Sequence, residues 1–156
     1  MKLIARLTDW LAALPLFVLL AIFNVAVVMR YFVDRPLQWT EEVAGLLMIW
    51  IVMLGGIAAE RDNQHLAIPV VVDLLPPKAT AAVNLVVSLL SAAFLLYVSY
   101  VGLMLALTVK FKVTDILRIS YFWIDIAIPV GFVVIAAYMV GQGVAQARKA
   151  FAETAR

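Results

Sequence analysis

Cysteine is absent from the 156-residue sequence, and histidine and charged residues are scarce. Without cysteine, the chain cannot supply disulfides, thiol chemistry or cysteine ligands for an iron–sulfur cluster. A single histidine excludes a haem held between two histidines of this chain. Only 14% of the residues are charged, and a net charge of +2 leaves no basic patch for nucleic acid. We therefore expect no cofactor and no nucleic-acid partner.

The residues that are present are mostly apolar, at 66% of the chain against about 45–50% in a soluble domain. A soluble fold of this length has too little interior to bury so much apolar surface. Lipid is the remaining solvent for these side chains. The composition therefore predicts an integral membrane protein surrounded by a lipid bilayer.

Four apolar stretches are long enough to cross a bilayer, at about 10–29, 40–59, 79–107 and 119–147. A helix needs about 20 apolar residues to cross a hydrocarbon layer about 30 Å thick. The stretches are continuously apolar, whereas membrane β-strands alternate, and a helix satisfies its own backbone groups in lipid. We expect an all-α membrane protein with four transmembrane helices, forming one domain over residues 1–156.

Two shorter features complete this topology. Residues 66–75 are apolar but too few to cross the bilayer, and they include Pro69 and Asp73, so we expect a short amphipathic segment in the interface. The first span is longer than the roughly 7–15 residues of a signal-peptide core and lacks a small-residue cleavage site. We expect this span to be retained as a membrane anchor.

The distribution of Lys and Arg predicts the orientation. Four spans place both termini on one side, which carries seven of these residues against five on the other. By the positive-inside rule this bias favours cytoplasmic termini. The connectors 30–40 and 108–120 would then lie on the opposite side.

The third span carries small and weakly polar residues on one face, and such residues let membrane helices pack closely. They fall within an arc of about 80° at 100° per residue, and they are Asn84, Ser88, Ser91, Ser99, Gly102 and Ala106. We expect this face to contact another helix, with a polar solute path as the alternative, and Tyr97 and Tyr100 to point the other way. Further close approaches are expected at Gly55, Gly56, Gly141 and Gly143.

Trp50 lies near the middle of the second span, away from the interface where membrane tryptophans gather. Its indole N–H needs a hydrogen-bond partner there. We expect an inward or subunit-facing side chain, with a lipid-facing one as the alternative.

Ionisable residues are few and lie near the ends of the spans. Glu41 and Glu42 open the second span, where the helix dipole favours negative charge. We expect them to act as dipole partners or as ion-pair partners of Arg30 or Arg35, with a transport or catalytic acid pair as the alternative. Asp125 is expected at the interface, with a proton carrier as its alternative.

His65 is expected in a loop, tethering its neighbours. A metal site would need further suitable ligands around it, and carboxylates alone make a weak case. No serine–histidine arrangement for an intramembrane hydrolase is apparent, because His65, the single histidine, lies outside the spans. The chain is therefore not expected to be an enzyme.

The sequences Arg30-Tyr31-Phe32, at the end of the first span, and Trp39-Thr40-Glu41-Glu42, at the start of the second, carry a resemblance to a known family. It continues through Trp50, Leu54-Gly55, Ala58, Arg61, His65, Asp73, Leu75-Pro76 and residues 128–132. The chain resembles the small membrane subunit of tripartite ATP-independent periplasmic (TRAP) transporters, the DctQ-like family. One departure is the missing proline shortly before the aromatic residues that enter the last span, which bears on the geometry of that loop.

The resemblance implies an accessory or scaffold subunit in the inner membrane of a bacterium. Such a subunit pairs with a large multi-span membrane subunit and helps to dock a periplasmic substrate-binding protein. The assembly imports organic acids, often carboxylates or sialic acid, by secondary active transport on a sodium gradient. An autonomous small homo-oligomeric transporter or channel is the main alternative, and a membrane-bound enzyme or redox subunit is the third.

The resemblance also suggests roles for individual residues. It implies that five residues organise the first hairpin: Arg30, Tyr31, Trp39, Glu41 and Glu42. Arg61 and His65 would organise the second loop, and Trp50 would serve helix or subunit packing. If the termini are cytoplasmic, the connectors 30–40 and 108–120 face the periplasm. Our hypothesis is that Arg35, Lys110 and Lys112 on these connectors help to dock the soluble protein.

Overall fold

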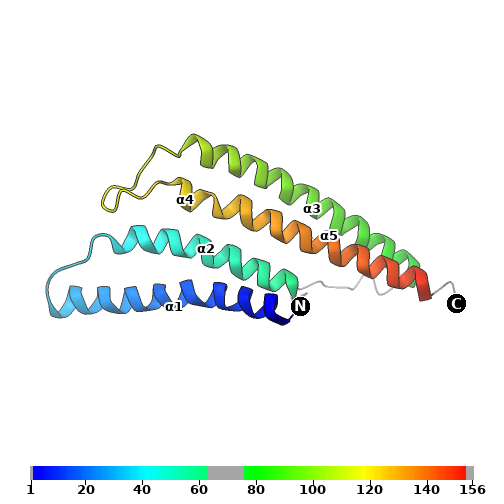
Figure 1. Ribbon diagram of the computed structural model, residues 1–156, viewed down its shortest axis with the longest axis horizontal. Helices are drawn as coiled ribbons and strands as arrows, with labels where there is room; N and C mark the ends of the chain where they lie inside the picture. Colours follow the sequence, from blue (N-terminus) through cyan, green and yellow to red (C-terminus); the bar gives the residue numbers. More distant parts are fainter. Residues whose placement is uncertain (1, 63–75, 154–156) are drawn as a thin grey trace.

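The computed structural model describes residues 2–62 and 76–153, and long helices dominate it (Figure 1). The helices are α1 (Lys2–Phe32), α2 (Thr40–Arg61), α3 (Pro77–Thr108), α4 (Phe122–Asp125) and α5 (Ala127–Glu153). Four segments are long and apolar enough to cross a membrane, the last combining α4 with most of α5. The predicted all-α membrane fold with four spans is confirmed.

The spans agree with the predicted boundaries within a few residues and run over Trp10–Phe32, Thr40–Arg61, Ala79–Thr108 and Phe122–Lys149. The predicted start of the last span at 119 is too early, because residues 119–121 belong to a hairpin described below. The expected interfacial segment 66–75 and His65 lie outside the described residues.

The helices lie side by side in a single row, in the order α1, α2, α5, α3 (Figure 1). Within the described parts of the chain, α1 contacts only α2 among the helices, and α3 contacts only α4 and α5. Such a row has little interior. Among the described residues, the buried hydrophobic side chains are those of alanines, apart from Leu19, Ile57 and Pro129. The fold therefore depends on close approach between backbones, which small side chains permit in a membrane.

The contact between α3 and α5 is the most extensive in the row. A Cβ atom added to Gly143 of α5 would lie 2.9 Å from the Cβ of Ser88 on α3. Ser99 is buried, and its hydroxyl donates a hydrogen bond of 2.9 Å to the carbonyl of Pro129. Tyr97 and Tyr100 are exposed on the other side of α3. The predicted helix-contact face is confirmed.

The contact between α2 and α5 also depends on glycine. A Cβ on Gly131 would lie 2.9 Å from the Cβ of Met53, and one on Gly56 would lie 3.3 Å from the side chain of Ile135. Gly55 and Gly141, in contrast, would have nothing within 4 Å of an added Cβ. The predicted close approaches hold for Gly56 and Gly143 and are wrong for Gly55 and Gly141, which face open space.

Pro129 explains why α4 and α5 are separate helices. It has no backbone N–H to donate to the carbonyl of Asp125, so one hydrogen bond of a continuous helix cannot form. The helical ladder is interrupted at Ile126, and the hydrogen bond from the Val130 amide to the Ile126 carbonyl resumes it at 3.2 Å. The break lies next to the connector that leads out of α3.

Candidate functional site

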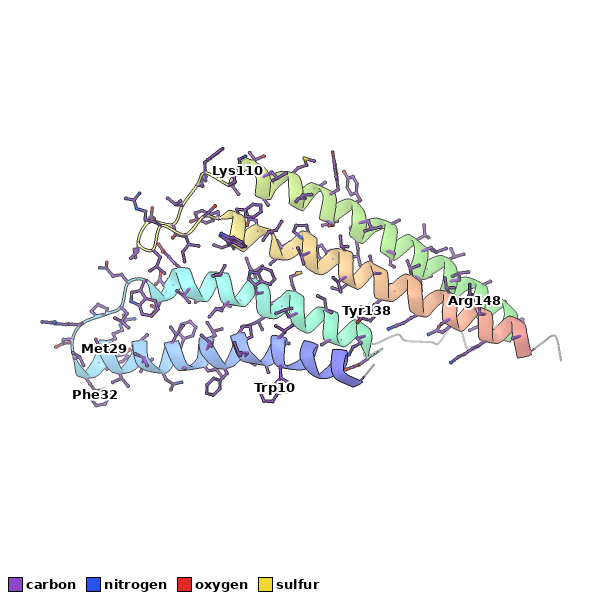
Figure 2. All side chains as sticks on the ribbon, in the orientation of Figure 1. Trp10, Met29, Phe32, Lys110, Tyr138 and Arg148 are labelled. Carbon is purple, nitrogen blue, oxygen red and sulfur yellow. The ribbon has the colours of Figure 1, made fainter. Side chains whose placement is uncertain are left out.

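Two connectors, 33–39 and 109–121, lie together at one end of the helix row, which we call the loop end (Figure 1). The N-terminus of α1 and the C-terminus of α5 lie at the other end. Phe32 on α1 and Lys110 after α3 mark opposite sides of the loop end (Figure 2). The loop end thus brings most of the residues singled out in the sequence into one region.

The second connector forms a short hairpin, residues 109–121. The amide of Thr114 donates to the carbonyl of Ile119 at 2.8 Å, and the amide of Tyr121 donates to the carbonyl of Lys112 at 3.0 Å. Thr114 is buried, and its hydroxyl accepts a hydrogen bond of 3.1 Å from the Ile119 amide. Arg118 closes the turn with a left-handed φ of 55°. The loop is therefore internally braced, although it lacks the proline found in the family pattern.

Ser120 joins the hairpin to α4. Its hydroxyl donates to the carbonyl of Lys110 at 2.7 Å and accepts from the amide of Phe122 at 3.2 Å. A serine hydroxyl suits this position, because the first amides of a helix have no partner within the helix. The hairpin and the start of the last span therefore form one continuous unit.

Glu42 attaches this hairpin to α2. Its two carboxylate oxygens accept hydrogen bonds from the consecutive amides of Ile116 and Leu117, at 2.8 and 2.9 Å. Within the described residues, neither Glu41 nor Glu42 forms an ion pair with Arg30 or Arg35. Both glutamates lie in the first turn of α2, as expected for dipole partners, and Glu42 has an additional role that the sequence did not suggest.

Trp50 makes a second link from α2 to the last span. Its indole N–H donates a hydrogen bond of 3.0 Å to the carbonyl of Trp123 in α4. The side chain is partly buried. This confirms the expectation that the indole finds an inward partner, and it shows that α4 supplies that partner.

The first connector, 33–39, leads into α2 through a turn. Trp39 occupies the N-cap position without a side-chain hydrogen bond, and the buried hydroxyl of Thr40 donates to the carbonyl of Leu37 at 2.7 Å. Asp34 turns the chain with a left-handed φ of 55°. The geometry is therefore set by a turn before the helix.

Between α1 and α2, an open hollow of about 460 Å³ follows this connector, and Arg30, Tyr31 and Glu41 are among its lining residues. The guanidinium of Arg30 lies 5.9 Å from the centre of the Tyr31 ring, within the range of a cation–π contact. Three residues assigned to the first hairpin therefore do lie together there.

The three proposed docking cations are exposed at the loop end: Arg35 on the first connector, and Lys110 and Lys112 on the hairpin. The ammonium of Lys110 lies 4.8 Å from the centre of the Phe111 ring. Phe111 is itself 84% exposed. The three cations therefore lie at the same end of the row, although 75 sequence positions separate Arg35 from Lys110.

Asp125 lies at the start of the last span. With Lys112 and Asp115, it lines an open pocket of about 400 Å³ beside the hairpin. This location agrees with the expected interfacial aspartate. It lies at the edge of the predicted span rather than near its middle.

At the opposite end of the row, Arg61 binds its neighbour Asp62. The guanidinium donates through Nε and Nη2 to the two carboxylate oxygens of Asp62, each at 2.8 Å. This interaction holds the pKa of Asp62 below its usual range. The side-chain amide of Gln142 donates to the Glu60 carbonyl at 2.7 Å and so joins α5 to the end of α2. Arg61 therefore binds its sequence neighbour at the end of α2, whereas His65 lies outside the described residues.

The sequence did not reveal several residues of this arrangement. Thr114, Ser120 and Gln142 all form hydrogen bonds that hold elements together. Thr114 and Ser120 precede the last span and Gln142 lies within it, so a polar side chain is their only common signal. Among the residues that the structure describes, no group of three or more potential metal ligands lies close together.

Comparison with known families decides the class of protein. The family described as "Tripartite ATP-independent periplasmic transporters, DctQ component" matches residues 18–149. The chain belongs to this family. The resemblance inferred from the sequence is confirmed, and the DctQ chain is an integral membrane protein of a transporter family, which is not a class of enzymes.

Relatives of this DctQ chain carry consistent names. It is 30% identical over 130 residues to the sialic acid TRAP transporter permease protein SiaT of Haemophilus influenzae (strain 86-028NP), covering 83% of this chain and 21% of SiaT. It is 32% identical over 80 residues to a protein of Haemophilus influenzae (strain ATCC 51907 / DSM 11121 / KW20 / Rd) assigned by name as a TRAP transporter small permease protein. That match covers 51% of this chain and 48% of the relative. The chain thus spans about a fifth of SiaT and about half of the second relative.

Proposed function

We propose that this chain is the accessory small permease subunit of a TRAP transporter that imports a carboxylate-type organic acid on an ion gradient. In this proposal it pairs with a large membrane subunit and helps to dock a soluble substrate-binding protein. Membership of the DctQ family supports the transporter class. The substrate class follows from the family resemblance, and the relative SiaT is named for sialic acid, which is itself a carboxylate.

One structural observation carries the accessory role: the helices form an open row with apolar side chains exposed along α1. Phe17 is 74% exposed, and Leu19 is the one buried side chain among residues 10–32. Lipid or another membrane protein must cover such a surface. Residues 10–32 of α1 bury only Leu19, whereas α3 buries Ala81, Ala92, Ser99 and Ala106 against its neighbours, so we take α1 as the surface for a large subunit.

The spans also contain little that could carry an ion. Charged residues within them lie in first or last turns, and the interior of each span holds none. Ion and proton paths usually contain ionisable groups inside the membrane. Asn24, the polar residue of the first span, donates to its own helix at the carbonyl of Leu20. These facts favour a scaffold over a transport path of the chain's own.

For orientation, we propose cytoplasmic termini and a periplasmic loop end in the bacterial inner membrane, following the excess of Lys and Arg on the terminal side. The exposed cations Arg35, Lys110 and Lys112 would then face the compartment of the soluble binding protein. A cationic surface can steer and orient a partner that presents carboxylates.

The first test is affinity purification of the chain from its own host at native expression level, in mild detergent, with mass spectrometry of the proteins recovered. We expect a much larger multi-span protein in near-equal amount. Recovery of the chain alone, or only as a homo-oligomer, would overturn the accessory role and favour the autonomous transporter. Asp125 would then be the next residue to mutate.

The docking role is tested by reversing the three cations together with Arg35→Glu, Lys110→Glu and Lys112→Glu. Exposed ion pairs are each worth about 0.2–1 kcal/mol, so we expect binding of the soluble protein to the membrane complex to weaken by about tenfold. Arg148→Glu with Lys149→Glu is the matched control, because these residues are exposed at the other end of the row. Unchanged docking and unchanged uptake after the triple reversal would rule out this surface.

A further inference from the structure

We propose that Glu42 positions the hairpin 109–121, which carries the docking cations Lys110 and Lys112. From the first turn of α2, Glu42 holds this hairpin in the orientation in which the soluble protein binds. This inference rests on the docking role proposed above and adds to it a residue and a partner surface. The resemblance assigned Glu42 to the helical hairpin of α1 and α2, whereas its contacts reach the connector 109–121.

The contact geometry is the first argument. Both oxygens of one carboxylate are used, and their donors, Ile116 and Leu117, are consecutive backbone amides at the hairpin tip. Hydrogen bonds from amides to an ionised carboxylate are shorter and stronger than neutral ones. Two parallel bonds also fix the direction of the tip, which a single bond would not.

The construction of the hairpin is the second argument. Its own backbone bonds, together with the hydroxyls of Thr114 and Ser120, hold its shape and join it to α4. The Thr114 hydroxyl also lies against the Glu42 carboxylate, so the link from the hairpin to α2 converges on Glu42. Among the described residues, Glu42 supplies the hydrogen bonds from α2 to the hairpin tip, whereas Trp50 holds α4 at the base of the hairpin. Loss of the Glu42 carboxylate should therefore leave a folded hairpin whose tip is no longer held against α2.

The exposed surface of the hairpin is the third argument, because it fits a soluble partner of definite chemistry. Ile116 and Leu117 are 47% and 40% exposed although Glu42 binds their amides. Lys112 and Arg118 are exposed on the same hairpin. The hairpin has three cations and one acid, Asp115. We therefore infer that the partner presents an apolar patch bordered by carboxylates.

The test compares Glu42→Gln, Glu42→Asp and Glu41→Gln in the complete membrane complex. Gln at 42 keeps the length but replaces one accepting oxygen with an NH₂ group, which cannot accept from an amide. Asp keeps the negative charge that the start of α2 favours, but it is one methylene shorter. Glu41→Gln removes the neighbouring charge, and Glu41 makes no hydrogen bond to the hairpin among the described contacts.

Hydrogen–deuterium exchange of the backbone is the first readout. Because hydrogen bonds from amides to an ionised carboxylate are stronger than neutral ones, we expect exchange at Ile116 and Leu117 to rise by about tenfold in Glu42→Gln. Glu42→Asp should behave in the same way, and Glu41→Gln should leave the exchange unchanged. If Glu42 served only the helix dipole, Glu42→Asp would match the wild type, and the inference would be overturned.

Binding of the soluble substrate-binding protein to the complex in lipid nanodiscs is the second readout. We expect docking to weaken by about five- to tenfold in both Glu42 variants, because a freely moving tip must be ordered again on binding. If the cation reversals weaken docking while both Glu42 variants bind normally, the inference is wrong and the docking role stands. If the cation reversals have no effect, the docking role itself fails.

Discussion

The two halves of the row are built in different ways. The α3–α5 pair is joined along a seam of small residues, in which Gly143 meets Ser88 and the Ser99 hydroxyl binds the Pro129 carbonyl. In the α1–α2 pair, α1 contacts only α2 among the described helices, and it buries only Leu19 among residues 10–32. The first half has a buried seam, although the outer face of α3 still exposes side chains such as Leu90 and Phe94, whereas the second leaves most of α1 for lipid or a partner.

The halves meet through α2, and polar contacts contribute at that boundary. Glu42 reaches the hairpin, Trp50 reaches the carbonyl of Trp123, and Gln142 reaches the end of α2. Lipid offers no hydrophobic driving force for helix association, so packing and hydrogen bonds must supply specificity. The comparison therefore predicts that mutations in the seam affect the stability of the chain, and mutations on α1 affect its assembly.

The largest effect is expected from Gly143→Ala in the seam. The new Cβ would lie 2.9 Å from Ser88 Cβ and Oγ, so α3 and α5 must move apart. Overpacking of this kind costs about 1–3 kcal/mol, measurable as a lower free energy of unfolding in a detergent or bicelle titration. Gly141→Ala is the control, because its Cβ meets open space and alanine is the better helix former by about 1 kcal/mol. Equal destabilisation by both variants would contradict the close approach of the two backbones.

A smaller effect on stability is expected on α1. Here a comparison of Leu19 and Phe17 distinguishes packing within the chain from assembly with the large subunit. Leu19→Ala removes a buried contact, and we expect the free energy of unfolding to fall by about 1–2 kcal/mol. This loss is smaller than is usual for such a change in a soluble protein, because lipid can fill the space. Phe17→Ala should leave the unfolding of the isolated chain almost unchanged, since Phe17 is 74% exposed. It should, however, reduce recovery of the large subunit in affinity purification. Normal recovery with Phe17→Ala would exclude this part of α1 from the interface.

Much of the fold could be predicted from the sequence because the bilayer imposes strong rules. Span length, continuous hydrophobicity and the need to satisfy backbone groups predict four helices with little freedom. The small-residue face of α3 was also readable, because helical periodicity places Ser88, Ser99 and Ala106 on one side. These are local properties, and the structure agrees with them.

The parts that could not be predicted depend on contacts distant in sequence. Glu42 and Ile116 are 74 positions apart, and Trp50 and Trp123 are 73 apart. Nothing local indicates which carbonyl an indole will find, or that a carboxylate will bind a loop rather than an arginine. The glycines show the same limit, because Gly141 and Gly143 look alike in the sequence and only the latter faces another helix.

The smallest effect is expected at Arg118, where the hairpin that joins the two halves makes its turn. With a φ of 55°, this residue adopts the left-handed conformation, which costs a residue with a Cβ about 1–2 kcal/mol and glycine little. Arg118→Gly and Arg118→Ala remove the same charge, so they isolate the backbone effect. We expect the glycine variant to keep slow hydrogen exchange at Ile116 and Leu117, and the alanine variant to exchange several-fold faster than the glycine variant. Identical exchange in both would mean that Glu42 alone determines the position of the tip, and that the turn contributes nothing to the connection between the halves.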